Sequence, residues 1–144
     1  MMGKEEIMKH IVHSKGFTLV ELILVVTIIG ILAAIAIPAY VGQQRNAART
    51  EAYSNLPALR LLEEQFFAEN ATYTAGAANT AAVQALFTGF QPGNGLNFTY
   101  SITQNVDING AAQTPCFSAI ATGIAGTRVA GEVYAIDCNN NRTF

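Results

Sequence analysis

A single carboxylate at the start of a long uncharged run is the feature that most constrains this chain. No charged side chain occurs from Leu22 to Val41, and Glu21 directly precedes that run. A helix needs about 20 apolar residues to cross a bilayer. Because an acidic group next to lipid is costly, such a group usually has a functional partner. The sequence therefore predicts a helix covered by lipid or by other subunits, in which Glu21 meets a specific cation.

The residues on either side of Glu21 carry a family resemblance. The segment Gly16-Phe17-Thr18-Leu19-Val20-Glu21, followed by the apolar run up to Pro38, resembles the N-terminus of type IV pilins and the type II secretion pseudopilins. The resemblance covers roughly the first third of the chain. It implies cleavage between Gly16 and Phe17 by a prepilin peptidase, methylation of the new amine, and assembly in which Glu21 of one subunit pairs with Phe17 of its neighbour.

The resemblance also implies an α+β pilin fold, in which a long N-terminal helix packs on a small antiparallel sheet with a C-terminal disulfide region. The segments expected from it are a cleaved leader (1–16), a transmembrane and filament-core helix (17–41), an amphipathic helix (42–70), a connecting loop (71–95) and the sheet (96–144).

An ordinary secretory signal peptide is the alternative for the N-terminus, with Ala34-Ile35-Ala36 as its cleavage site. Three observations count against it. The apolar run is longer than a typical signal-peptide core, Glu21 would lie inside that core, and Pro38 follows closely after the supposed cut.

Three residues are expected to disturb the long helix. Gly30 is a poor helix former, and Pro38 and Pro57 each lack the amide hydrogen that a helix uses. The sequence predicts bends at both prolines. The resemblance implies that the helix between Gly30 and Pro38 loosens when subunits pack in a filament.

After Val41 the apolar residues recur at steps of three or four, which is the spacing of one helical face. This stripe should cover a sheet, and the charged residues fall mainly off it. The stripe consists of Ala48, Ala52, Leu56, Leu59, Leu62 and Phe66.

The remainder of the chain predicts three antiparallel strands. Apolar and polar residues alternate over 96–103, which is the period of a half-buried strand. Two further strands are expected over 117–122 and 132–138, and Asn-Gly in 107–110 supplies a turn. A short helix is expected over 81–87.

Cys116 and Cys138 are the only cysteines, and they flank the last two predicted strands. Their separation fits neither a zinc site nor a covalent haem site. In an exported protein a disulfide is the natural interpretation, and it contributes about 3 kcal/mol in the chain-entropy model. In the pilin family such a loop commonly forms exposed surface.

Composition excludes several classes of function. A chain cut after Gly16 keeps no histidine and no lysine, and its five arginines and eight acids give a net charge of −3. Histidine-based or metal-dependent catalysis, a bound cofactor and direct nucleic-acid binding are therefore not expected. Calcium is disfavoured too, because it takes six or more oxygens and only the acidic residues Asp107, Glu132 and Asp137 lie in the C-terminal part.

Three Asn-x-Thr triplets, at 70–72, 97–99 and 141–143, match the N-glycosylation pattern. Such triplets are expected by chance in an Asn- and Thr-rich chain, so none is predicted to be a site.

The leading hypothesis is a structural subunit of a type IV pilus-like filament that serves adhesion, motility or DNA uptake. Its expected partners are identical subunits, the peptidase and an inner-membrane assembly platform. The precursor would span the inner membrane once with its N-terminus in the cytoplasm, and the assembled pilus would be extracellular.

A minor pilin or a secretion pseudopilin is the nearer alternative to this hypothesis. A membrane-anchored binding module that never polymerises is the alternative from another class, although a mere anchor would have no use for Glu21. Electron conduction along the helix aromatics is less favoured than simple packing.

Overall fold

The computed structural model describes residues 16–144, so all of the predicted leader except Gly16 lies outside the described residues. Contacts divide the chain into a first unit that ends at Ala39 and a second unit, Tyr40–Phe144. Helix α1 (Leu19–Asn70) begins in the first unit and ends in the second. The second unit also contains α2 (Thr80–Leu86), β1 (Phe98–Val106), β2 (Ala112–Gly123) and β3 (Val133–Asp137).

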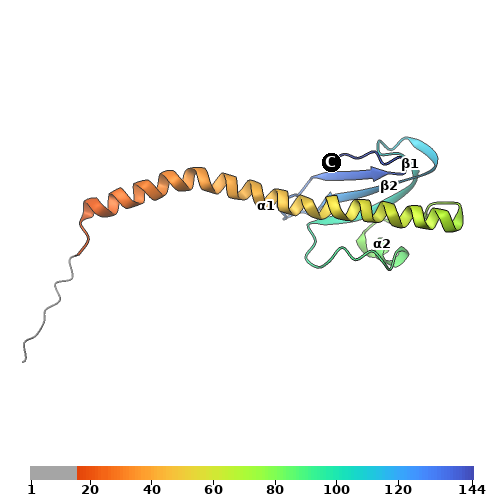
Figure 1. Ribbon diagram of the computed structural model, residues 1–144, viewed down its shortest axis with the longest axis horizontal. Coiled ribbons are helices and arrows are strands. Elements are labelled where there is room, and N and C mark those ends of the chain that lie inside the picture. The colour runs from red at the N-terminus through yellow and green to blue at the C-terminus, as the bar shows by residue number, and fades with distance from the viewer. Residues whose placement is uncertain (1–15) are drawn as a thin grey trace, which may run out of the picture. The chain divides into compact units, whose positions relative to one another are not determined.

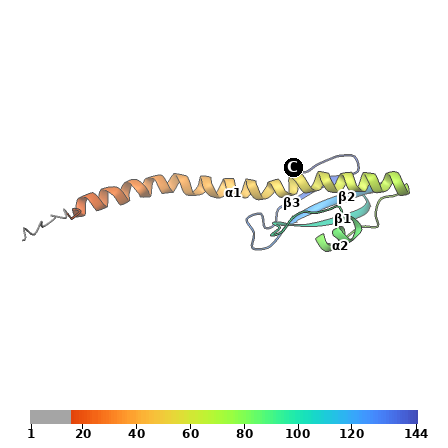
Figure 2. The same ribbon diagram turned by 60° about the horizontal axis from the view of Figure 1, so that its bottom comes forward.

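In the second unit, the C-terminal part of α1 lies across a three-stranded antiparallel sheet (Figure 1, Figure 2). The strand order is β1-β2-β3, with Phe98 opposite Gly123 and Ser118 opposite Asp137. The predicted stripe on α1 is confirmed, because Ala52, Leu56 and Leu59 are fully buried and the other three members pack partly buried against the same core. The predicted α+β pilin fold is thus confirmed.

Strand β1 buries alternate residues, as its sequence pattern predicts. Phe98, Tyr100 and Ile102 are buried, and the residues between them are half-exposed. Strand β2 begins earlier than predicted, at Ala112. Pro115 lies in this added part of the strand, although proline cannot donate to a sheet ladder. The structure accommodates it where the pairing of β1 and β2 is irregular, between Gln104 and Val106.

Both outer edges of the sheet are partly occupied by neighbouring chain. The C-terminal tail covers β3, since Ala135 N–H donates to Thr143 Oγ1 at 2.8 Å and Thr143 N–H donates back to Ala135 O at 3.2 Å. Three amides of β1 are bonded outside the ladder, and these bonds are Phe98 N to Glu51 Oε1, Tyr100 N to Thr80 Oγ1 and Ile102 N to Ala77 O. Edge strands with free amides invite pairing with other chains. These contacts satisfy much of that capacity within one chain.

Two acidic residues of α1 connect it to the rest of the second unit, although the sequence placed both mainly off the buried stripe. Glu51 accepts from the Asn97 amide at 2.8 Å and from the Tyr100 hydroxyl at 3.0 Å. Glu63 is fully buried and accepts from the backbone amide and the hydroxyl of Thr74. These carboxylates fix the start of β1 and the segment after α1 against the helix.

Candidate assembly and processing site

The predicted cleavage junction lies just before α1. Gly16 and Phe17 are outside any helix or strand, and 88% of the Phe17 surface is exposed. A peptidase needs an accessible and locally extended bond, and exposed segments of this kind are where chains are most readily cut. The geometry is therefore compatible with cleavage between these two residues.

Thr18 and Glu21 form a capping box at the N-terminus of α1. The Thr18 amide and hydroxyl both donate to Glu21 Oε2 at 3.0 Å, and the Glu21 amide donates to Thr18 Oγ1 at 3.2 Å. Such a reciprocal pair satisfies amides that a helix start leaves without partners. The helix consequently begins at Leu19 rather than at Phe17. This role of Glu21 was not predicted, although Thr-x-x-Glu before an apolar run is the sequence signal of a capping box.

The capping box corrects one inference from the sequence. A simple membrane anchor does have a use for Glu21, because the carboxylate holds the first turn of its own helix. The presence of Glu21 therefore does not by itself exclude an anchor. However, all three bonds involve Oε2 or the Glu21 backbone, and Oε1 accepts no hydrogen bond from residues 16–144.

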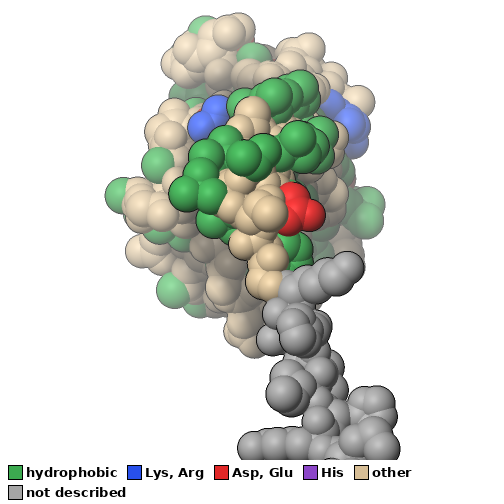
Figure 3. Space-filling view, turned by 90° about the vertical axis from the view of Figure 1, so that its left-hand side faces the viewer, with side chains coloured by type: hydrophobic (Ala, Val, Ile, Leu, Met, Phe, Trp, Pro, Cys, Tyr) green, Lys and Arg blue, Asp and Glu red, His purple; other side chains and the backbone are tan. Residues whose placement is uncertain are grey.

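The N-terminal half of α1 presents apolar side chains on all sides. The large aliphatic residues from Leu19 to Val41 have 47% to 73% of their surface exposed. Among the described helices, α1 alone has a stretch long and apolar enough to cross a membrane. Hydrophobic side chains surround the N-terminal end of α1 (Figure 3). Thr27 is a polar residue within this stretch, and its hydroxyl donates to Ile23 O at 2.7 Å, as is usual for threonine in such helices.

The helix is continuous at the three residues that were expected to disturb it. Helix α1 runs without a gap through Gly30, Pro38 and Pro57. A proline removes one backbone hydrogen bond, and the bonds of the adjacent turns hold the helix across that defect. The described chain thus has one continuous helix, and the bends expected at the two prolines stay predictions. Loosening between Gly30 and Pro38 inside a filament stays a prediction.

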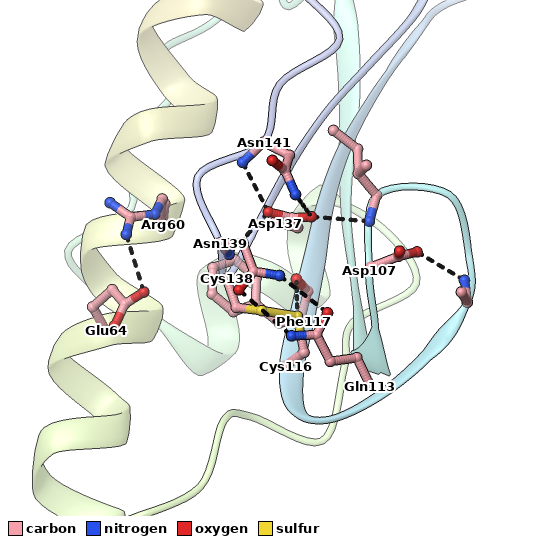
Figure 4. Close-up of a disulfide and its surroundings, with 12 residues drawn as sticks. Arg60, Glu64, Asp107, Gln113, Cys116, Phe117, Asp137, Cys138, Asn139 and Asn141 are labelled. Atoms are coloured by element: carbon pink, nitrogen blue, oxygen red, sulfur yellow. Dashed lines mark hydrogen bonds and ion pairs between the residues drawn. A yellow bond between two sulfur atoms is a disulfide. The ribbon is translucent and has the colours of Figure 1, made fainter.

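The predicted disulfide is confirmed: Cys116 at the centre of β2 is bonded to Cys138 just after β3. Next to the disulfide, Asp137 is fully buried and accepts hydrogen bonds from the surrounding loops (Figure 4). Asp137 accepts from the amides of Asn139 and Asn141 at 2.9 Å and from that of Ile108 at 3.2 Å. The disulfide and this carboxylate together fix the tail and the β1–β2 turn to one end of the sheet.

A two-pronged ion pair holds the loop inside the disulfide against α1. Arg49 Nε and Nη2 donate to the two oxygens of Glu132 at 2.9 and 2.7 Å, and Tyr134 Oη donates to the same carboxylate at 2.9 Å. The Arg49 hydrogen bonds hold the pKa of Glu132 below its usual value, and that of Arg49 is raised in return. One turn earlier, Arg45 Nε donates to Arg128 O at 3.2 Å.

The carboxylates considered for calcium already have protein partners. Asp107 accepts from the amides of Asn109 and Ala111, and Glu132 and Asp137 are bonded as described above. Within residues 16–144, no three potential metal ligands lie together. The side-chain amides of the Asn-x-Thr triplets are likewise engaged, from Asn70 to Phe66 O, from Asn97 to Glu51 and from Asn141 to Asp137.

Comparison with known proteins identifies the family. Residues 12–37 match the prokaryotic N-terminal methylation motif, a match that includes the Gly16–Phe17 junction and Glu21. The chain is also 32% identical over 111 residues to the type IV wide pilus major component PilA4 of Thermus thermophilus. That alignment covers 77% of the chain and 76% of the relative. The chain belongs to the type IV pilin family.

Two further relatives match the pilin over parts of their length. The pilin is 37% identical over 106 residues to the type IV major pilin protein PilA of Myxococcus xanthus, which covers 72% of the pilin and 44% of PilA. It is 51% identical over 55 residues to a fimbrial protein of Pseudomonas aeruginosa, which covers 38% of the pilin and 36% of that protein. The matched region thus spans less than half of these two relatives. No solved structure matches the pilin.

Proposed function

We propose that this pilin is a structural, non-enzymatic subunit that polymerises through the N-terminal half of α1 into a type IV pilus-like filament. The observation that carries the proposal is the exposed apolar surface from Leu19 to Val41, which begins directly after an accessible Gly16–Phe17 junction. A surface of this kind is covered by lipid before assembly and by neighbouring helices afterwards. Apolar contact at about 25 cal/mol per Å² supplies the cohesion.

Pairing between subunits sets the register of assembly. Cleavage after Gly16 leaves an α-ammonium on Phe17, and methylation of that amine would preserve its charge. The Glu21 oxygen Oε1 is unused by the capping box, so the carboxylate can cap its own helix and still accept the amine of a neighbour. In low dielectric an unpaired carboxylate is costly, which favours register-matched subunits over mismatched ones.

The proposal includes the partners and the route of export. A prepilin peptidase removes residues 1–16, and an inner-membrane platform adds the subunit to the filament. Lys4, Lys9 and Lys15 precede the span, and the positive-inside rule places them in the cytoplasm. The second unit then lies outside the inner membrane, where its disulfide can form.

Relatives named as major pilins favour the main subunit of the filament over a minor pilin or a pseudopilin. The task that we propose for this filament is adhesion, motility or DNA uptake. A deletion strain scored for surface attachment, surface spreading and transformation tests each of them. If DNA uptake is lost, we expect the filament rather than the isolated subunit to be responsible, because the cleaved subunit is acidic and lacks lysine.

The first experiment is an intact-mass measurement of sheared surface filaments. The mass should match a chain that begins at Phe17, with or without one methyl group. A chain that begins near Ile37 would instead support cleavage by an ordinary signal peptidase, and the pilin mechanism would fail.

The second experiment separates the charge of Glu21 from its capping role. Glu21→Gln keeps a side chain that can cap, whereas Glu21→Ala removes both cap and charge. Both variants should leave processed subunit in the membrane and produce few or no filaments. Normal filament numbers with Glu21→Gln would show that the charge is not the assembly determinant.

A further inference from the structure

Almost every carboxylate of the second unit is committed to a partner inside the chain. The exception among the described residues is Glu69, near the C-terminal end of α1. Its one hydrogen bond comes from the neutral amide of Gln65, one turn earlier, at 3.4 Å, and Glu69 is exposed. The committed carboxylates are Glu51, Glu63, Glu64, Glu132, Asp107 and Asp137.

The arginines show the matching pattern. Arg49 is paired with Glu132 and Arg60 with Glu64, while Arg142 donates to Asn140 and lies over the ring of Phe144. Three arginines, Arg142 among them, form no ion pair with a carboxylate within residues 16–144. The other two are Arg45 and Arg128, which are exposed and adjacent, since Arg45 Nε donates to Arg128 O. We call them the Arg45–Arg128 pair.

Glu69 cannot reach this pair within one chain. Arg45 and Glu69 lie about 36 Å apart along α1, at a rise of about 1.5 Å per residue. The Arg45–Arg128 pair lies where the chain enters the second unit, and Glu69 lies at the far end of the helix. One end of the unit thus offers unmatched positive charge and the other end offers unmatched negative charge.

The surface beside Glu69 is hollowed. Glu69 borders a groove of about 400 Å³ whose apolar lining includes Leu62, Phe66, Leu86 and Phe87. Leu86 is itself 45% exposed. An arginine has an apolar stem and a planar charged head, so it can lie along such a groove and reach the carboxylate at its border.

We propose that Glu69 of one subunit pairs with the Arg45–Arg128 pair of a neighbouring copy, an inference that rests on the filament proposed above. The contact joins two different surfaces of the same chain, and a contact of that type repeats into an open filament when it does not close into a ring. Exposed ion pairs add little affinity individually. Their effect is to exclude wrong registers, since like charges brought together are costly.

A charge-swap series in the intact pilin tests the proposal. Glu69→Arg alone and Arg128→Glu alone should each lower filament yield by roughly tenfold, because each places like charges together in every subunit contact. The double variant Glu69→Arg/Arg128→Glu should restore most of the yield. Arg128 is the preferred partner to exchange, because its side chain makes no hydrogen bond within the described residues, whereas Arg45 holds the loop. Thr103→Arg, at an exposed position on β1, is the control and should have wild-type yield.

Immunoblots of membranes verify that each variant is folded and processed. If a charge reversal lowers subunit abundance, the neutral variants Glu69→Gln and Arg128→Gln replace it. Both should reduce yield, and the double neutral variant should be no worse than either single one, since both remove the same contact.

The proposal is overturned if the single charge reversals leave the filament yield unchanged. It is also overturned if the filament yield of the charge-swap double variant does not exceed that of the lower-yielding single reversal. A third contradicting outcome is that the losses of filament yield in the two neutral single variants add up in the double neutral variant. The Glu21→Gln variant distinguishes this from failure of the filament itself. If Glu21→Gln forms no filaments while all Glu69 and Arg128 variants form normal filaments, only the proposed contact of Glu69 is wrong. If the wild-type pilin forms no filaments, the proposed function is wrong.

Discussion

Thr18 and Glu21 are joined by three hydrogen bonds, two of which end on a single carboxylate oxygen. The helix therefore uses only one side of the acid for its own start. The other oxygen is available to a second subunit, so capping and assembly do not compete for the same atom. This geometry allows the two roles of Glu21 to be tested separately.

Thr18→Ala should loosen the first turn of α1, while Thr18→Ser should leave it intact. Loss of a Ser or Thr cap should raise hydrogen exchange at the amides of residues 19–22 by roughly fivefold. Glu21→Gln should exchange like the wild type although it assembles poorly, because glutamine also completes a capping box. The measurement is hydrogen exchange on detergent-extracted subunit. Equal exchange in Thr18→Ala and wild type would show that the cap does not stabilise this helix start.

The Phe17 amine should be the only reactive amine of the processed pilin, because all three lysines precede it. An amine-directed reagent should label extracted subunits at that one position, unless methylation blocks it. Intact filaments should label poorly, because the amine is then paired and buried among helices. Strong labelling of intact filaments would place the amine in solvent and contradict its pairing with Glu21.

The disulfide should contribute about 3 kcal/mol to the stability of the second unit, as the chain-entropy model gives for a loop of this size. The double variant Cys116→Ser/Cys138→Ser avoids a free thiol and should lower the denaturant midpoint accordingly. Wild-type pilin treated with reductant is the matched control and should unfold at the same midpoint as the variant. Free alkylation of both cysteines without reductant would contradict the structure.

Local patterns made much of this fold predictable. The stripe containing Leu56 and Leu59 and the alternation from Phe98 to Ile102 each follow one periodicity, and the disulfide follows from having only two cysteines in an exported chain. The ends of the elements were less predictable, because they depend on single contacts. Helix α1 starts at Leu19 because Thr18 caps it, and β2 extends to Ala112 despite Pro115.

The polar contacts of the second unit could not be predicted, because their partners are far apart in the sequence. Glu51 bonds to Asn97, and Glu63 bonds to Thr74, yet both acids resemble ordinary solvent-facing helix residues in the sequence. The same limit applies to Glu69 and Arg45. The contact proposed for them can be inferred only after the other carboxylates of the second unit have been matched with their partners in the structure.

Arg49 and Glu132 give a prediction for the loop inside the disulfide. Glu132→Gln and Arg49→Lys should both release the loop, since lysine cannot donate the two parallel bonds of a guanidinium. The Arg49 bonds lower the pKa of Glu132 in the folded state, so the pair stabilises the fold above the ordinary glutamate pKa of about 4.3. That stabilisation is lost as the pH falls through the lowered pKa. The melting temperatures of wild type and Glu132→Gln should therefore differ at pH 7 and converge in acid. A difference in melting temperature that stays constant with pH would contradict the stabilising role of the ion pair.

Glu63 should show the opposite pH dependence. Burial is the main cause that raises its pKa, with the Thr74 bonds acting in the other direction. An acid whose pKa is raised by folding favours the fold when it is protonated. The contribution of Glu63 to stability is therefore complete below about pH 4.3 and is lost as the pH rises through the raised pKa.

The variant Glu63→Gln keeps the size of the side chain and an acceptor for the Thr74 amide but carries no charge. Its melting temperature should match the wild type in acid and exceed it increasingly toward neutral pH. Glu63→Ala is the contrasting variant, and it should be about 2 kcal/mol less stable than Glu63→Gln at every pH, because neither variant titrates and Ala leaves the buried Thr74 amide without an acceptor. If Glu63→Gln is less stable than the wild type at pH 7, the buried carboxylate is ionised and stabilising, and the assigned direction of its pKa shift is wrong.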